Sequence, residues 1–168
     1  MNRNTVFLLD TNVFIEAAKR YYAFDIAPGF WGALLTHAEA GRIISIDRVF
    51  DELARGKDHL FRWVQNNMKD YFRSTGERNV LEVYAQLMRW GQRQSHFTSQ
   101  ARREFAEADN ADPWLVAYAK AKGYVLVTLE KNNPGMRRKI PIPSACQAFQ
   151  VPYMDTFKML RKLSVTFQ

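Results

Sequence analysis

Four acidic residues stand close to the ends of apolar segments, where carboxylates can take part in chemistry. They are Asp10, Glu52, Asp112 and Glu130. Asp10 directly follows the most hydrophobic run of the N-terminal part, and Glu130 follows a second such run. Ionised carboxylates that lie close together raise one another's pKa or recruit a cation. If the fold brings the four together, they predict a centre for metal ions or for acid–base chemistry.

Three short apolar runs have the length and composition of strands that are buried on both faces. They are Val6–Leu9, Arg42–Ile46 and Tyr124–Thr128. Segments with helical spacing lie between them, such as the one that begins at Pro113 and ends before Gly123. Strands that alternate with helices predict an α/β fold with βαβ units and a mainly parallel sheet.

The rest of the chain predicts helices and two further strands. Residues 59–108 have a helical pattern throughout, which predicts a helical insertion packed beside the sheet. After Pro134, the pattern predicts a short strand near Ile140–Ile142, a short helix and an edge strand at Val151–Met154. Asp155 is then expected to cap a terminal helix.

The predicted sheet brings the four acids to one edge. In an open parallel sheet, ligands bind at the edge formed by the carboxyl ends of the strands. Asp10 and Glu130 should converge there, and Glu52 and Asp112 can reach the same edge from the first turns of helices. An all-oxygen set without Cys or His favours Mg²⁺ or Mn²⁺ over Zn²⁺. One such ion, or a pair about 3.5–4 Å apart, can activate water for the cleavage of a phosphodiester.

Each of the four acids also has a purely structural interpretation. Asp10 can cap the helix that follows it, and Asp112 stands before Pro113 as a favourable helix cap. Glu52 can lie on a solvated helix face, and Glu130 can belong to a turn. The joint placement, rather than any one acid, therefore carries the functional interpretation. Two further acids are alternative ligands, Asp47 and Asp109.

Composition limits the class of protein. The chain has 168 residues, of which 47% are hydrophobic, enough for one domain with a substantial core. A formal net charge of +7 is compatible with a polyanionic partner, nucleic acid first. Cys146 is the only cysteine, so no intrachain disulfide can form and a reducing compartment fits best. No signal-peptide or membrane-spanning pattern is visible, so we expect a cytoplasmic protein without a membrane partner.

Three motifs, in order along the chain, resemble the PIN-domain family of VapC-like toxin ribonucleases. The motifs are "LLDTNVFIEA", "SIDRVFDEL" and "ADPWLVAYAKAKGYVLVTLE". The 18-residue step from Asp112 to Glu130 agrees with the usual spacing of that family. The segments "RYYAFDIAPGFW" and "KIPIPSACQAFQVPYMD" further resemble a PIN subgroup known only as a domain of unknown function. The resemblance covers both ends of the chain, with the helical middle as the variable region.

The resemblance implies a fold and a set of site residues. The fold is a single PIN-like domain over residues 1–168, a three-layer α/β/α arrangement with a central, mainly parallel sheet of four to five strands. The helical insertion corresponds to about 59–108. The implied catalytic and metal-binding residues are Asp10, Glu52, Asp112 and Glu130, and the implied supporting residues are Thr11, Asn12 and Thr128. Glu130 stands where many relatives have Asp, and Asn132 where a further Asp is common, which lowers the negative charge of the site.

The resemblance also implies an activity and partners. The activity is that of a Mg²⁺- or Mn²⁺-dependent endoribonuclease, with one or two ions, which cleaves RNA phosphodiesters with metal-activated water. Toxins of this type have a cognate antitoxin protein and often form homodimers. The basic stretch after Glu130 supplies candidate RNA contacts, in balance with a merely solvated charge run. These contacts are Lys131, Arg137, Arg138 and Lys139.

Other interpretations of the sequence stay open. The fold could bind RNA or a protein without cutting it, although all four acids are present. An Asp-dependent phosphatase would also have an Asp after its first strand, but it needs a second Asp where this chain has Asn12. The aromatic cluster at 21–31 could stack bases or accept an antitoxin segment, and it could equally be core or a dimer interface.

Overall fold

The computed structural model describes residues 4–167, and within them a five-stranded, all-parallel sheet forms the centre of the fold. The strands lie in the order β3-β2-β1-β4-β5. Their bounds are β1 Phe7–Leu9, β2 Ile43–Ile46, β3 Phe72–Arg73, β4 Val125–Val127 and β5 Tyr153–Met154. The α/β class and the parallel sheet predicted from the sequence are confirmed.

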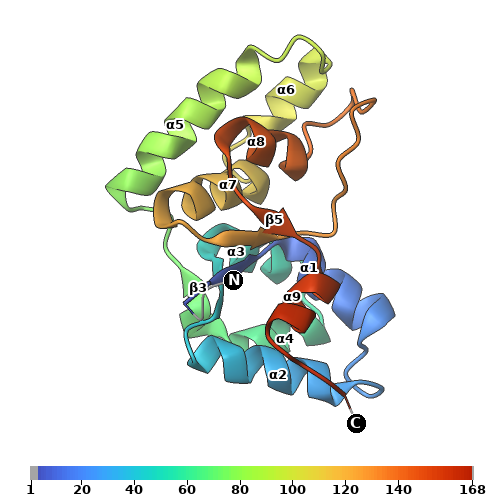
Figure 1. Ribbon diagram of the computed structural model, residues 1–168. Helices are drawn as coiled ribbons and strands as arrows, with labels where there is room; N and C mark the ends of the chain where they lie inside the picture. Colours follow the sequence, from blue (N-terminus) through green and yellow to red (C-terminus); the bar gives the residue numbers. More distant parts are fainter. Residues whose placement is uncertain (1–3, 168) are drawn as a thin grey trace.

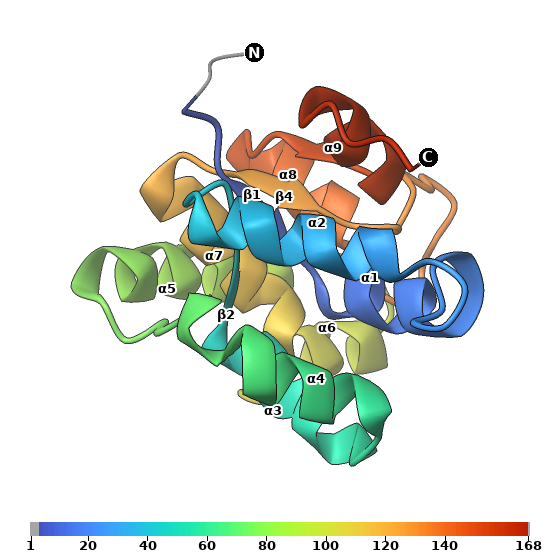
Figure 2. The same cartoon turned by 90° about the horizontal axis from the view of Figure 1, so that it is seen from below.

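Helices cover both faces of the sheet. In Figure 1, α5, α7 and α8 lie on one side, and α2, α4 and α9 lie on the other. Figure 2 shows the second layer from the side of α2 and α4. The helices near the N-terminal half are α1 Thr11–Glu16, the π-helix η1 Ala17–Tyr21, α2 Pro28–Glu39, α3 Asp47–Gly56 and α4 His59–Asn67. The others are the 3₁₀ turn η2 Lys69–Tyr71, α5 Arg78–Gln92, α6 Ser99–Phe105, α7 Ala111–Lys122, α8 Ile142–Phe149 and α9 Thr156–Lys162.

The three central strands are short and lie buried between two helical layers. Every residue of β1, β2 and β4 is buried. Ser45 is the polar member of this set, and its hydroxyl donates a hydrogen bond of 2.7 Å to the Leu9 carbonyl. Burial of both faces removes any alternation from the sequence, which is why continuous apolar runs identify these strands.

Helix α7 is the most deeply buried helix of the described residues, and its first turn lies at the carboxyl edge of the sheet. Its residues from Pro113 to Ala119 are all buried, because α5 and α8 pack on it from outside while it also contacts β4 and α3. It ends at Gly123, whose φ of +73° suits glycine. A helix held on every side fixes the direction of the side chains in its first turn, Asp112 among them.

Two details of the predicted architecture differ from the structure. Ile140 and Pro141 form no strand, and Ile142 already begins α8, so the strand predicted near Ile140–Ile142 is wrong. The apolar residues there are buried as helix and loop, and Pro141 and Pro143 hinder strand pairing. In addition, the segment 59–108 contains the edge strand β3, which pairs with β2 and extends the sheet. Two residues are too few to show a strand period.

The tail follows the prediction more closely. The edge strand β5 lies within the predicted segment Val151–Met154. Asp155 caps α9, since its carboxylate accepts a hydrogen bond of 2.8 Å from the Lys158 backbone N–H. Over the described residues, every helix is too short or too polar to cross a bilayer.

Candidate active site

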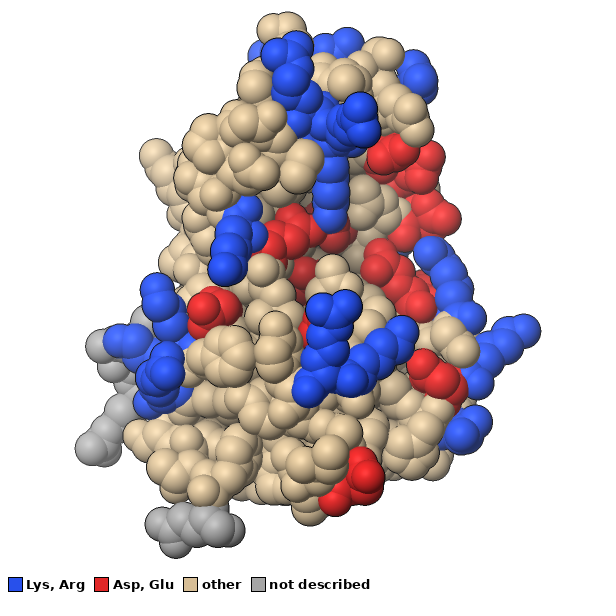
Figure 3. Space-filling model, turned by 90° about the vertical axis from the view of Figure 1, so that its right-hand side faces the viewer, with Lys and Arg blue, Asp and Glu red and all other residues tan. Residues whose placement is uncertain are grey.

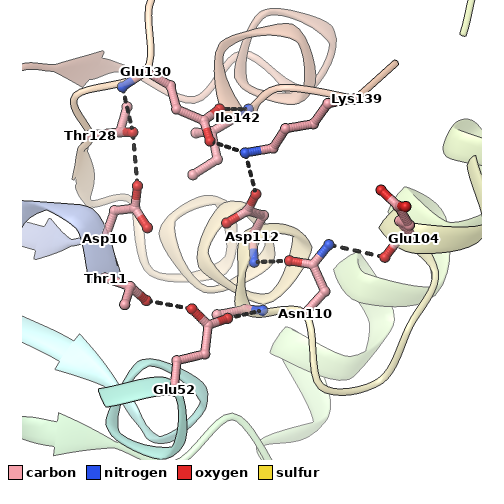
Figure 4. A network of polar contacts seen from close by, with 11 residues as sticks. Asp10, Thr11, Glu52, Glu104, Asn110, Asp112, Thr128, Glu130, Lys139 and Ile142 are labelled. Carbon is pink, nitrogen blue, oxygen red and sulfur yellow. Dashed lines mark hydrogen bonds and ion pairs between the residues drawn. The ribbon is translucent and has the colours of Figure 1, made fainter. Parts of the chain in front are cut away.

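Asp10 and Thr128 meet at the carboxyl edge of the two central strands. Leu9 and Val127 are paired in register, and the Asp10 N–H continues the pairing with a 3.0 Å bond to the Val127 carbonyl. The Thr128 hydroxyl donates to Asp10 Oδ2 at 2.9 Å (Figure 4). Asp10 occupies the position before α1 but makes no capping bond with its side chain. Its carboxylate is therefore held by the neighbouring strand and not by the helix.

Glu52 is fixed from the side of α3. Its Oε2 accepts a 2.9 Å hydrogen bond from the Thr11 hydroxyl, and its Oε1 accepts one of 2.9 Å from the Ala111 backbone N–H. These two bonds tie α3 to the first residues of α1 and α7. A solvated helix face is the alternative interpretation of Glu52 from the sequence, but the side chain points inward to the ends of two other helices.

Asp112 lies in the first turn of α7 and does not cap it. The cap is Asn110, whose side-chain oxygen accepts a 3.0 Å bond from the Asp112 N–H. The capping interpretation of Asp112 is therefore wrong, since the preceding Asn110 fulfils that task. The carboxylate of Asp112 is left to face Asp10 across the gap in Figure 4.

Glu130 is held by the chain that follows it. Its Oε2 accepts a 2.8 Å bond from the Ile142 N–H at the start of α8, and its Oε1 pairs with the Lys139 ammonium. The Glu130 N–H donates in turn to the Thr128 hydroxyl at 3.1 Å. These contacts of Glu130 with Ile142 and Lys139 hold the loop 131–141 against the sheet edge. This structural role is independent of any chemical role of Glu130.

Lys139 reaches into the group of acids. Its Nζ lies 3.5 Å from Asp112 Oδ2 and also pairs with Glu130. We call Asp10, Glu52, Asp112 and Glu130 together the acid centre. A cavity of about 290 Å³ is lined by three of its members, Asp10, Glu52 and Asp112, whereas Glu130 lies beside it, outside the lining. Its lining includes Asp10, Glu52, Asp112, Lys139, Thr11, Asn12 and Asn110, with Ala101, Glu104, Phe105 and Ile140 completing the wall.

The electrostatics of the acid centre favour neutralisation by a cation. Burial, reinforced by the nearby charges of Asp112 and Glu130, raises the pKa of Asp10 well above its usual value, although the hydrogen bond from Thr128 opposes this. Burial also raises the pKa of Asp112 to about 6, despite the nearby Lys139. Burial lowers the pKa of Lys139, but Asp112 and Glu130 together outweigh it and the pKa rises. Ionised acids at this site are therefore costly without a positive charge beside them.

The donor chemistry of the cavity fits a hard divalent cation. The cavity lining contains carboxylates, the amides of Asn12 and Asn110, and neither Cys nor His. Asp10 is 2% exposed, and only its Oδ2 is hydrogen-bonded within residues 4–167, so Oδ1 is available to a cation. In the described side-chain arrangement, however, no three Asp, Glu, His or Cys residues stand close enough to hold an ion. Lys139 occupies the space between two of them instead.

The two acids that the sequence offered as alternative metal ligands, Asp47 and Asp109, lie outside the cavity. Asp47 accepts hydrogen bonds from Arg48 and Thr75, and Asp109 forms a surface ion pair with Arg55 at 3.6 Å. Both residues take part in these structural contacts instead.

Two polar residues of the cavity lining were not predicted from the sequence, namely Glu104, on α6, and Asn110. Nothing in the local sequence distinguishes Glu104 from other exposed helix residues, since only the packing of α6 brings it to the cavity.

The basic loop after Glu130 divides into two parts. All four basic residues are exposed, but Lys139 differs from Lys131, Arg137 and Arg138 because its ammonium also pairs with the acid centre. The loop is also fastened to the start of α6, because the Thr98 N–H donates to the Arg137 carbonyl at 2.9 Å. Figure 3 shows acidic side chains in a hollow on one face, with Lys and Arg side chains around it.

The aromatic cluster at 21–31 is mainly core. Phe30 and Trp31 are buried, Tyr22 stacks on Phe30, and Phe24 stacks on Trp31. Tyr21 differs, since it is 51% exposed and contacts Phe157 edge to face. Of this cluster, Tyr21 is therefore the side chain most accessible to a partner.

Comparisons with known proteins agree on the fold. A chain of VapBC2 from Rickettsia felis, solved bound to a DNA fragment from the promoter, is 15% identical, with 90% of this chain and 98% of that chain covered at a TM-score of 0.54. A chain of FitAcB from Neisseria gonorrhoeae is 18% identical, with 89% and 96% covered at a TM-score of 0.54. The predicted VapC-like PIN-domain fold is confirmed. No curated protein sequence matches significantly. The profile of the family described as "Domain of unknown function (DUF4411)" matches residues 7–167.

Proposed function

This chain belongs to the DUF4411 family, and we propose that it is a metal-dependent endoribonuclease. The single observation that carries the proposal is the acid centre. Strand ends and helix starts far apart in the sequence direct Asp10, Glu52 and Asp112 into one cavity at the carboxyl end of a parallel sheet, and Glu130 lies beside it, paired with Lys139 of the cavity lining. Burial raises the pKa values of Asp10 and Asp112, so these two acids cost stability when ionised unless a cation binds beside them.

The residues of this chain have distinct roles in the proposal. Asp10 and Asp112 face each other and are the principal ligands for Mg²⁺ or Mn²⁺, with Glu52 and Glu130 at the sides. Thr11 and Thr128 orient Glu52 and Asp10 through their hydroxyl groups. A bound divalent cation would supply activation of water and neutralisation of charge at the scissile phosphate.

The surface around the cavity suits an RNA backbone. The exposed Lys131, Arg137 and Arg138 follow the acid centre directly and can neutralise phosphates on either side of the cleavage point. A second cavity of about 520 Å³ adjoins Glu130 and is lined by Tyr21, Phe157 and Lys131 among others. Tyr21 is exposed beside Lys131, and an exposed aromatic ring in a basic groove is typical of surfaces that bind single-stranded nucleic acid.

A toxin role is the setting that the structural neighbours support. VapBC2 and FitAcB are toxin–antitoxin complexes, so we propose that this chain also has a cognate antitoxin protein and that it acts in the cytoplasm. A homodimer belongs to the same proposal. Three of the large apolar side chains that are exposed, Tyr21, Ile26 and Phe167, border a cavity of about 560 Å³ that a protein partner could cover.

One observation favours a second candidate function, an inert PIN-like module that binds RNA or protein. Lys139 pairs with Asp112 and Glu130 and so neutralises part of the acid centre without any metal. A nuclease and an inert module differ in one respect that can be measured, namely whether RNA is cut in the presence of Mg²⁺ or Mn²⁺.

The test is cleavage of a mixed single-stranded RNA pool with Mn²⁺, Mg²⁺ or EDTA. We expect metal-dependent cutting by the wild type and none by Asp10→Asn, because the substitution removes the buried carboxylate on which the other acids converge. Asp51→Asn, an exposed acid on α3, is the matched control and should cut like the wild type. Cleavage by Asp10→Asn at the wild-type rate would contradict the mechanism. RNA binding without cutting would favour the inert module.

A further inference from the structure

Lys139 lies at the surface with a half-exposed side chain, yet its ammonium is a cation of the acid centre. It follows the exposed Arg137 and Arg138, yet its ammonium lies 3.5 Å from Asp112 and pairs with Glu130 (Figure 4). The two acids are only 17% and 15% exposed at their side chains. Each partner belongs to a different element, so the lysine joins the start of α7 to the segment after β4.

The backbone around Lys139 supports this position. The following residue, Ile140, is buried in the core, and the Ile142 N–H is bonded to Glu130 on the other side. On the preceding side, the Arg137 carbonyl accepts a hydrogen bond from Thr98. The loop is thus anchored before and after Lys139, and the start of its side chain is fixed near the acids.

The side chain itself can still leave. It is 48% exposed, so a change of rotamer can carry the ammonium into solvent without any movement of the anchored backbone. A divalent cation near Asp112 and Glu130 would repel the ammonium and take the same carboxylates. Because the ion and the ammonium are both positive, each weakens the binding of the other to these acids.

We propose that Lys139 is a built-in counter-ion that competes with the divalent cation for Asp112 and Glu130. This inference rests on the proposed metal-dependent function. Lys139 holds the two acids together when no ion is bound, and it must turn away before they can serve as ligands. Such competition accounts for the finding that no three acids of the described chain are grouped as ligands while the lysine lies between two of them. Lys139 is in this sense a positioning residue for the acids.

The test is Mn²⁺ binding measured by isothermal titration calorimetry on the full chain without RNA. Lys139→Met keeps the length of the side chain and removes its charge. We expect it to bind Mn²⁺ about tenfold more tightly than the wild type, within the usual range for coupled ligands. Lys131→Met is the matched control, because Lys131 is an exposed lysine of the same loop without an ion pair to the acid centre. It should bind Mn²⁺ like the wild type. Unchanged or weaker binding by Lys139→Met overturns the inference.

A measurement on the wild type covers the case in which Lys139→Met does not fold. The ¹H–¹⁵N signal of the Lys139 ammonium should be protected from exchange in the metal-free protein, because two carboxylates hold it. Saturation with Mg²⁺ should abolish that protection. A protected signal that persists at saturating Mg²⁺ would show that the lysine stays in place, which is incompatible with competition.

The outcomes separate this inference from the proposed function. If the wild type binds Mn²⁺ and Asp10→Asn does not, the metal centre stands, and only the comparison with Lys139→Met decides the role of the lysine. If Mn²⁺ binds to Lys139→Met but not to the wild type, the inference is supported in its strongest form. If neither protein binds Mn²⁺, the metal centre is wrong and the inference falls with it.

Discussion

At the scale of single residues, each acid of the acid centre has at least one hydrogen-bond donor or cation as a partner. The Thr128 hydroxyl donates a hydrogen bond to Asp10, the Thr11 hydroxyl donates one to Glu52, and the Lys139 ammonium forms an ion pair with Asp112. These partners reduce the cost of burial but do not remove it, because the pKa values of Asp10 and Asp112 are still raised. The site is therefore less stable than a neutral version of itself would be.

The titration of Asp112 gives the first prediction on stability. Its pKa in the folded protein is about 6, above the ordinary 3.8, chiefly because of burial. Ionised Asp112 therefore destabilises the fold fully above pH 6, and this cost decreases as the pH falls from 6 to 3.8 and is gone below 3.8, where both states are protonated. In EDTA, Asp112→Asn should be more stable than the wild type by about 1–3 kcal/mol at pH 7.

The gain should shrink as the pH falls through the same window, which chemical denaturation at several pH values can measure. Asp51→Asn changes an exposed carboxyl and should follow the wild-type curve. A stabilisation by Asp112→Asn that is equal at pH 4 and pH 7 would contradict the assignment of the cost to this carboxylate.

Two buried threonines give a matched pair of predictions. The Thr128 hydroxyl donates to Asp10 and accepts from the Glu130 N–H, whereas the Thr156 hydroxyl is the one buried side-chain polar atom within residues 4–167 that has no partner. Thr128→Val should lower the free energy of unfolding by about 1–3 kcal/mol, because it leaves buried groups unpaired. Thr156→Val should raise it by about 1 kcal/mol, since it replaces an unpaired hydroxyl with a methyl group. Denaturant unfolding of both variants checks the opposite signs.

At the scale of elements, the wall of the cavity depends on how closely α6 approaches α5. Gly91 of α5 faces Phe105 of α6, and a Cβ at position 91 would lie 2.8 Å from the Phe105 ring. Phe105 and Ala101 form part of the wall beside Glu104. Because position 91 has no side chain, α6 can pack closely enough on α5 to reach the acid centre.

Gly91→Ala tests this close approach against helix propensity. Alanine is favoured over glycine in a helix by about 1 kcal/mol. The clash with Phe105 should exceed that gain and destabilise the protein by about 1–3 kcal/mol. Gly32→Ala in α2 is the control, because nothing lies within 4 Å of its Cβ position, and it should stabilise the protein. Thermal unfolding distinguishes the two, and a stabilised Gly91→Ala would mean that α6 can shift freely.

At the scale of the whole molecule, a positive protein surrounds a negative hollow. The formal net charge is +7, while the hollow in Figure 3 is lined by acids. Long-range attraction therefore brings a polyanion to the surface, but its phosphates are repelled at the acid centre unless a cation is present. This arrangement favours joint binding of RNA and a metal ion.

The exposed arginines of the basic loop give the prediction at this scale. Arg137→Ala with Arg138→Ala should weaken RNA binding and reduce the salt slope of log K by about 0.7 for each phosphate that is no longer neutralised. Arg62→Ala with Lys69→Ala removes the same charge from the region of α4 and should leave the slope close to that of the wild type. Fluorescence anisotropy in EDTA at several salt concentrations measures both, and equal slopes for the two double variants would exclude a specific role of the loop.

Local patterns are sufficient for much of the fold and for the choice of candidate acids. The buried strands β1, β2 and β4 lie in runs that are apolar except for Ser45, and α7 has Pro113 in its first turn and ends before Gly123. Because parallel strands present their carboxyl ends at one edge, the position of Asp10 after β1 is enough to place it there. These features depend on residues close together in the chain, so they can be predicted from the sequence.

The contacts that define the cavity, in contrast, depend on tertiary packing. The neighbouring residues Asn110 and Asp112 could both cap α7, and only packing against Glu52 and Lys139 decides which of them does. Lys139 resembles its basic neighbours in sequence, yet the burial of Ile140 directs it inward. Glu104 reaches the cavity because α6 packs on α5. Such contacts join residues far apart in the chain, so their geometry depends on how the elements pack.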